Sequence, residues 1–190
     1  MSSSIARLSL AALTATLAGC AADAPLDPSA ALPRSTPSAP ALAVSAAETE
    51  GALVARLRQA SVRFRDIQVA IDEGYVQASP CLPGFGVVFR NLTLFDGVVD
   101  PEHPELLLYE PQKNGDMRLG AVEMIILAIP WDAIHSGPPT YAGQEFEDRR
   151  APGSAGPPFP NYALHAWVWQ HNPDGLFTPY NPRIACESAP

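Results

Sequence analysis

The chain has 190 residues, with 12 Lys and Arg against 20 Asp and Glu, and its net charge at pH 7 is -8. An acidic chain without a basic patch cannot displace counterions from phosphate, which argues against nucleic acid as a partner. After the N-terminus the longest apolar run is Met124 to Trp131, far short of the roughly 18 residues that a membrane-spanning helix needs.

The first 20 residues have the layout of a bacterial lipoprotein signal. They contain one positive charge (Arg7), an apolar core over 5–17 and small residues just before Cys20. This layout predicts a signal peptide over 1–19 and a mature N-terminus at Cys20, whose sulfur carries the lipid. An ordinary signal peptide with a chance cysteine is the alternative. Ala21, and not Asp, follows the cysteine. We therefore expect the protein to be anchored in the outer membrane, facing the periplasm, if the host is Gram-negative.

The segment from Cys20 to Ala47 consists mainly of Ala, Pro and Ser, with few large apolar residues. Such a composition cannot bury enough surface to offset the chain entropy, so we expect a disordered tether over 20–47. Its prolines keep it extended and hold the domain away from the bilayer. Residues 48–190 then form a single globular domain of ordinary size.

A helical pattern follows the tether. Apolar residues recur at intervals of three and four, at Leu53, Leu57, Ala60, Phe64, Ile67 and Ile71. This spacing predicts one amphipathic helix from Glu48 to Glu73, which Gly74 ends, and its apolar face needs a partner.

After Gly74, Pro and Gly recur at short intervals, and segments rich in β-formers lie between them. We expect strands at 86–91, 105–110, 118–130, 142–146 and 162–170. The turn Asn172-Pro173-Asp174-Gly175 ends the last of them. The fold class is therefore α+β, with the helix packed on an antiparallel sheet that is either open or partly curled into a barrel.

Cys81 and Cys186 are the two cysteines of the predicted domain. In an exported domain two cysteines most often pair, so we predict a disulfide that closes nearly the whole sheet region into one loop. A reactive thiol is the alternative, but the sequence around Cys81 offers no neighbour that would stabilise a thiolate.

Two residues are the main candidates for a functional site. His165 lies in a predicted strand on the same face as Trp167 and Trp169, so it either hydrogen-bonds inside the core or faces a cavity. Glu123 lies among Val, Met and Ile, where a carboxylate needs a cation, a metal or a hydrogen-bonding partner. We predict that Glu123 and His165 are in contact on neighbouring strands and line the same cavity as Trp167.

Glu105 and Glu110 flank an apolar strand and are five positions apart, so in a regular strand they point to opposite faces. One of them can therefore join His165 and Glu123, and the set His165, Glu123 and Glu110 is a possible ligand set for a divalent metal. No spacing motif such as His-x-His supports it. Tyr109, Phe89, Trp167 and Trp169 are the aromatic residues that either line a pocket or simply pack in the core.

Several motifs together resemble an uncharacterised family of bacterial exported proteins. They are Gly84-Phe85-Gly86-Val87-Val88-Phe89-Arg90-Asn91, Pro104-Glu105-Leu106-Leu107-Leu108-Tyr109-Glu110-Pro111, Val122-Glu123, Leu164-His165-Ala166-Trp167-Val168-Trp169, Asn172-Pro173-Asp174-Gly175-Leu176-Phe177 and Asn181-Pro182. The resemblance covers about residues 55–186. It implies a polar cluster suggestive of a cupin-like metal site, but the family pattern has a histidine where this chain has Val88, so one implied ligand is missing.

Two functions are consistent with these observations. The first is a lipid-anchored envelope protein that binds a small molecule or an envelope partner, with the aromatic residues lining the pocket or surface. The second is a metal-dependent, cupin-like enzyme that uses His165, Glu123 and one of Glu105 or Glu110. The incomplete ligand set favours the binding protein.

Overall fold

The computed structural model of the chain describes residues 49–153 and 156–186. The predicted signal peptide (1–19), the lipidation site Cys20 and the tether (20–47) lie outside these residues. The described residues belong to one compact unit. No helix in this part of the chain has the length and apolar character that crossing a membrane requires.

The first layer of the fold is helical, but it is not the single helix predicted over 48–73. It consists of α1 (Glu50–Ser61), the 3-10 helix η1 (Val62–Arg65) and α2 (Ile67–Asp72). The prediction of one continuous helix is wrong because Asp66 adopts an extended conformation and caps α2, accepting a hydrogen bond from the Gln68 amide at 2.9 Å. The predicted apolar face holds in α1 and η1, where Leu53, Leu57 and Phe64 are fully buried, but in α2 Ile71 is 45% exposed, contrary to the prediction.

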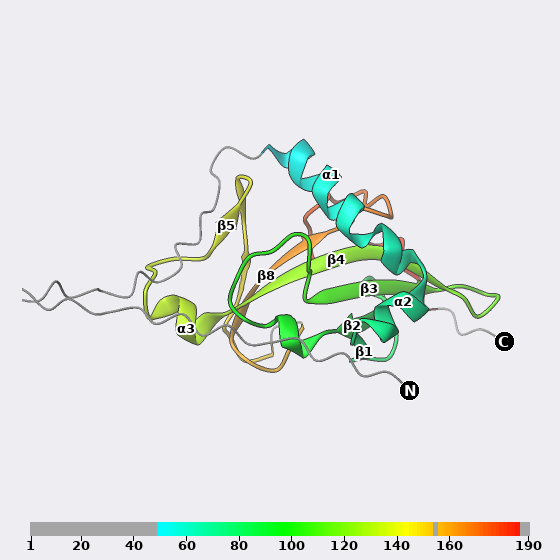
Figure 1. The fold of residues 1–190 in the computed structure, drawn as a ribbon, viewed down its shortest axis with the longest axis horizontal. Coiled ribbons are helices and arrows are strands. Elements are labelled where there is room, and N and C mark those ends of the chain that lie inside the picture. The colour runs from blue at the N-terminus through cyan, green and yellow to red at the C-terminus, as the bar shows by residue number, and fades with distance from the viewer. Residues whose placement is uncertain (1–48, 154–155, 187–190) are drawn as a thin grey trace, which may run out of the picture. The chain divides into compact units, whose positions relative to one another are not determined.

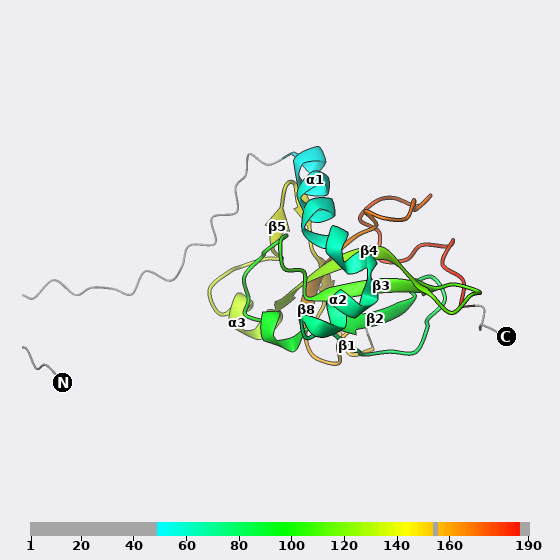
Figure 2. The same cartoon turned by 45° about the vertical axis from the view of Figure 1, so that its right-hand side comes forward.

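The second layer is a six-stranded antiparallel sheet in the order β1-β2-β3-β4-β8-β7. The strands are β1 (Val76–Gln77), β2 (Val87–Arg90), β3 (Leu106–Pro111), β4 (Met117–Leu127), β7 (Glu147–Arg149) and β8 (Asn161–Ala166). Figures 1 and 2 show α1 lying across the long central strands β3 and β4. The α+β class is confirmed, and the sheet is open, since β1 and β7 are its two edges and do not pair.

Smaller elements differ from the predicted strands. The strand predicted over 118–130 ends at Leu127, where the chain turns into α3 (Ala128–Asp132). Pro130 fits there because the first turn of a helix needs no amide donor at that position. The strand predicted over 142–146 is instead a hairpin of β5 (Thr140–Tyr141) and β6 (Gln144–Glu145). A 3-10 turn, η2 (Leu92–Leu94), follows β2.

Both faces of the sheet are buried, and a different part of the chain packs on each face. On the face that we call the helix face, Val122, Met124 and Leu164 pack with the buried residues of α1 and η1. On the opposite face, the loop face, Ala121, Ile125 and Ala163 pack with Phe85 and Ile184, which come from loops. Strand alternation places Glu123 and His165 on the loop face.

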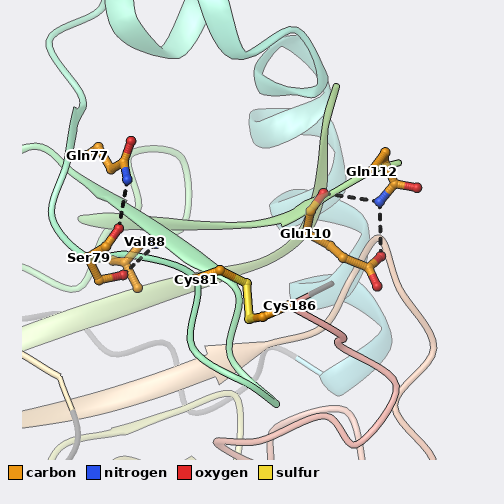
Figure 3. Close-up of a disulfide and its surroundings, with 7 residues drawn as sticks. All are labelled: Gln77, Ser79, Cys81, Val88, Glu110, Gln112 and Cys186. Carbon is orange, nitrogen blue, oxygen red and sulfur yellow. Dashed lines mark hydrogen bonds between the residues drawn. A yellow bond between two sulfur atoms is a disulfide. The ribbon is translucent and has the colours of Figure 1, made fainter. Parts of the chain in front are cut away.

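The predicted disulfide between Cys81 and Cys186 is confirmed (Figure 3), with the two Cα atoms 5.6 Å apart. Two backbone hydrogen bonds accompany it. The Gly84 amide donates to Ile184 O at 3.1 Å, and the Asn181 amide donates to Gly84 O at 2.8 Å. The disulfide therefore fastens the loop that carries Phe85 to the C-terminal segment of the described chain.

Candidate functional site

Antiparallel register places four side chains in one row across the loop face. Arg90 on β2 is opposite Leu106 on β3, Leu106 is opposite Glu123 on β4, and Glu123 is opposite His165 on β8. Opposed residues in an antiparallel pair have their Cβ atoms only about 4.5–5.5 Å apart. The predicted proximity of Glu123 and His165 on neighbouring strands is thus confirmed.

Arg149 from edge strand β7 completes a buried cluster with these two residues, which we call the Glu-His-Arg cluster. Its Nη1 donates to Glu123 Oε1 at 2.7 Å, and its Nη2 contacts His165 Nδ1 at 3.2 Å. The same guanidinium also donates to Glu147, from Nη2 at 2.7 Å and from Nε at 2.9 Å. Arg149 is therefore the cation that a buried Glu123 requires.

These contacts determine which nitrogen of His165 carries the hydrogen. A guanidinium has only donors, so His165 Nδ1 must accept from Arg149, and the hydrogen of the neutral imidazole is on Nε2. Nε2 lies 3.3 Å from Glu123 Oε2, although neither of these atoms has a well-aligned hydrogen bond. The imidazole thus lies between the Arg149 guanidinium and the Glu123 carboxylate.

Burial and charge act in opposite directions on Glu123. Burial alone would raise its pKa, but the contacts with His165 and Arg149 outweigh burial, and the pKa of Glu123 lies below its ordinary value. The cluster is closed to solvent, because Glu123 is 0% exposed and Arg149 and His165 are each 2% exposed. A substrate has no direct access to it in this structure.

Phe85 and Gly156 cover the cluster. The Phe85 ring meets the His165 ring edge to face, with the centroids 5.0 Å apart. Gly156 has a positive φ of 102°, and a Cβ atom there would lie 2.8 Å from Arg149 Nη1. Only glycine allows the backbone to pack this closely over the guanidinium.

A cavity of about 200 Å³ lies over the other half of the row, and we call it the loop-face pocket. Phe85 forms part of its wall, so one ring separates this pocket from His165. The walls are mainly apolar and include Leu82, Phe85, Val88, Leu106, Pro157 and Pro158. Val88, one of these residues, is the position at which the resemblance implied a missing histidine ligand.

Two polar side chains in the wall of this pocket have donors to spare. Arg90 is half-buried, and its Nε has no hydrogen-bond partner within the part of the chain that the structure describes. Ser79 Oγ accepts from the Val88 amide at 3.1 Å (Figure 3), which leaves the hydroxyl hydrogen free to donate. By contrast, Arg63 and Arg118 pair with Glu73 and Glu110.

Glu105 lies next to Leu106 but does not join the Glu-His-Arg cluster. Its Oε2 accepts a hydrogen bond from the Ile125 amide at 3.0 Å. Glu105 directly precedes β3, so its side chain supplies the acceptor that this β4 amide needs at the start of the β3–β4 pairing. Burial, with a smaller contribution from nearby carboxylates, raises the pKa of Glu105 to about 9. The carboxyl is therefore protonated at neutral pH, which makes it a poor metal ligand.

Glu110 and Tyr109 also lie apart from the cluster. Glu110 pairs with Arg118 and accepts from Gln112 Nε2 at 3.2 Å, near the far end of β3. Tyr109 is on the helix face, and its hydroxyl donates to Phe64 O at 2.7 Å. A register shift between Leu108 and Tyr109 makes β3 irregular. The expectation that Glu105 and Glu110 point to opposite faces assumed a regular strand.

The two tryptophans line a separate hollow of about 370 Å³ with Arg58 and His171. Trp167 Nε1 donates to Thr178 O at 2.8 Å, and Trp169 Nε1 donates to Ser61 Oγ at 2.9 Å. Trp167 shares the loop face with His165, but the two residues do not line a common cavity, because His165 is sealed beneath Phe85. Phe89 packs against Tyr109 on the helix face.

The set His165, Glu123 and Glu110 is not assembled. Within residues 49–153 and 156–186, no group of three or more His, Cys, Asp or Glu side chains is arranged to hold a metal ion. A guanidinium already neutralises Glu123 and occupies His165 Nδ1. Any metal would have to displace this contact.

Sequence reasoning did not find Arg149, Arg90 or Phe85 as parts of this region. Arg149 had a weak signal, since an arginine two positions from Glu147 in a short charged segment suits an edge strand with alternate residues facing inward. The sequence contains no comparable signal for Arg90 and Phe85, because their roles depend on strand register and on the loop that covers the cluster.

No family model, no curated protein and no solved structure matches this chain. The resemblance to exported bacterial proteins therefore stays a prediction from the motifs.

Proposed function

We propose that this chain is a lipid-anchored protein of the bacterial cell envelope whose folded domain binds a small molecule. The observation that carries the binding function is the loop-face pocket, an apolar cavity with a small number of polar groups in its wall. That combination is typical of ligand sites, where apolar walls supply the affinity and a few polar groups fix the orientation.

The size of the pocket limits the ligand. A dry apolar cavity of about 150 Å³ holds a benzene molecule, so about 200 Å³ accommodates one ring with a short substituent. The walls come from separate parts of the chain that the sheet and the disulfide hold in place. Such a pocket is formed before the ligand arrives, which lowers the cost of binding.

The binding function can be tested by filling the pocket. Ala78 lines the pocket, and it is exposed enough to accept a larger side chain without strain in the core. In a screen of ring-sized fragments, ligands should raise the melting temperature of the wild-type domain, and Ala78→Phe should abolish these shifts. The measurement is differential scanning fluorimetry of the protein produced with Cys20→Ser.

Ala55→Phe is the matched control, because Ala55 is exposed on α1, which covers the other face of the sheet. It adds the same ring and should leave the shifts unchanged. If no fragment shifts the wild-type protein, or if Ala78→Phe responds like wild type, the pocket is not a binding site.

The anchor is tested separately. The small residues before Cys20 support lipidation at its sulfur, and acyl chains are the expected link to the membrane. Cys20→Ser should move the protein from the membrane fraction to the soluble fraction of the cells. A variant that stays on membranes after a high-salt wash would mean that the anchor lies elsewhere.

The metal-dependent, cupin-like enzyme has less support. It requires His165, Glu123 and one of Glu105 or Glu110 as ligands. Arg149 competes for the first two, Glu105 is protonated at neutral pH, and Glu110 is paired with Arg118.

A further inference from the structure

The loop-face pocket contains a charge, that of Arg90, without an ion-pair partner among residues 49–153 and 156–186. Arg90 lies in its wall with Nε buried, and within the described part of the chain that atom has no hydrogen-bond partner. A half-buried guanidinium without a partner is unfavourable, because burial removes part of its hydration and nothing replaces it.

Ser79 adds a second donor to the same wall. Its Oγ accepts from the Val88 amide at 3.1 Å, and its hydroxyl hydrogen remains available to donate to a ligand. Arg90 and Ser79 therefore both present donors, and the third polar side chain of the wall, Tyr180, has a hydroxyl that can also donate. A group that only accepts hydrogen bonds and carries negative charge complements them.

We propose that the ligand of the loop-face pocket is a small apolar monoanion, a carboxylate on a single ring or a branched aliphatic body of similar size. The carboxylate binds the Nη nitrogens of Arg90, because Nε itself is buried, with Ser79 as a second donor, and the body fills the space between Phe85 and Leu106. The ligand class rests on the proposed function, because it assumes that the pocket binds small molecules. Arginine suits a carboxylate because its planar fork can bind both oxygens.

Phenylacetate is the probe that fits this description, and phenylacetamide is its neutral counterpart of nearly the same shape. A ligand of this size is expected to bind with a dissociation constant on the order of 1 mM. The measurement is therefore an NMR titration of amide shifts in the isotope-labelled domain with its disulfide intact. We expect phenylacetate to bind wild type about tenfold to a hundredfold more tightly than phenylacetamide.

Arg90→Gln should remove this preference. Phenylacetate should lose about tenfold to a hundredfold in affinity, and phenylacetamide should change little. Arg90→Lys keeps the charge without the planar fork and should fall in between. The matched control is Arg65→Gln, which removes the same charge from an exposed arginine in the helical layer and should leave both affinities as in wild type.

Stability separates a ligand-binding arginine from a structural one. Because the Nε of Arg90 has no partner among the residues that the structure describes, Arg90→Gln should leave the melting temperature unchanged or raise it. A marked fall would indicate a structural role and overturn the proposal.

The remaining outcomes separate the two proposals. Equal affinities for the two probes, or a preference that survives in Arg90→Gln, overturn the anionic ligand, while the proposed binding function stands as long as Ala78→Phe still abolishes binding. If neither probe nor any other ring-sized fragment binds wild type, both proposals fail.

Discussion

Removal of the Cys81–Cys186 disulfide is expected to lower the free energy of unfolding by about 4–5 kcal/mol. The two cysteines are separated by 105 residues, so the crosslink restricts a long loop in the unfolded chain. In the chain-entropy model a loop of about 100 residues accounts for about 4.7 kcal/mol at 25 °C. The measurement is urea denaturation of a Cys81→Ser/Cys186→Ser double variant against the oxidised protein, both with Cys20→Ser.

The double variant should also lose affinity for pocket ligands before it unfolds. The disulfide and the backbone bonds between Gly84 and the C-terminal segment hold the loop that carries Phe85, and Phe85 is a wall of the pocket. Dithiothreitol added to the oxidised protein should reproduce both effects, which excludes an artefact of the serines. A stability loss below about 1 kcal/mol would contradict the loop argument.

The sequence predicted those features of the fold that depend on local patterns. The spacing of Leu53, Leu57 and Phe64 placed one apolar face correctly over α1 and η1. The predicted strands around Val88, Leu108 and Ile125 correspond to β2, β3 and β4. What local periodicity could not show is the break at Asp66, where a side-chain cap competes with continuation of the helix.

The candidate site was predictable only in part. The pairing of Glu123 with His165 could be inferred because both are polar residues in apolar strands, and a buried acid needs a partner. The sequence did not show that the partner is an arginine from an edge strand, because the contact depends on Arg149 being opposite Asn161 in the register of β7 and β8. For the same reason Arg90 escaped notice, since its surroundings come from loops that are distant along the chain.

Arg149→Met is expected to lower the free energy of unfolding at pH 7 by about 3–5 kcal/mol, because it leaves a buried carboxylate without its cation. Glu123 has a lowered pKa in the folded protein, so its pairing stabilises the fold above its ordinary pKa of about 4.3. This stabilisation is lost as the pH falls and Glu123 becomes protonated. The effect of Arg149→Met should therefore be largest at neutral pH and smaller near pH 4, as measured by urea denaturation at both pH values.

Two further variants make this expectation specific to the buried charge. Adding Glu123→Gln to Arg149→Met removes the unpaired carboxylate and should recover a large part of the lost free energy of unfolding. If the loss came instead from a cavity left by the shorter side chain, Glu123→Gln would not recover it. Arg150→Met is the matched control, because the ion pairs of this neighbouring arginine with Asp132 and Asp148 are exposed, and such pairs contribute little. If Glu123→Gln recovers nothing, Arg149 stabilises the fold by packing over the sheet, and the Glu-His-Arg cluster is not held together by charge.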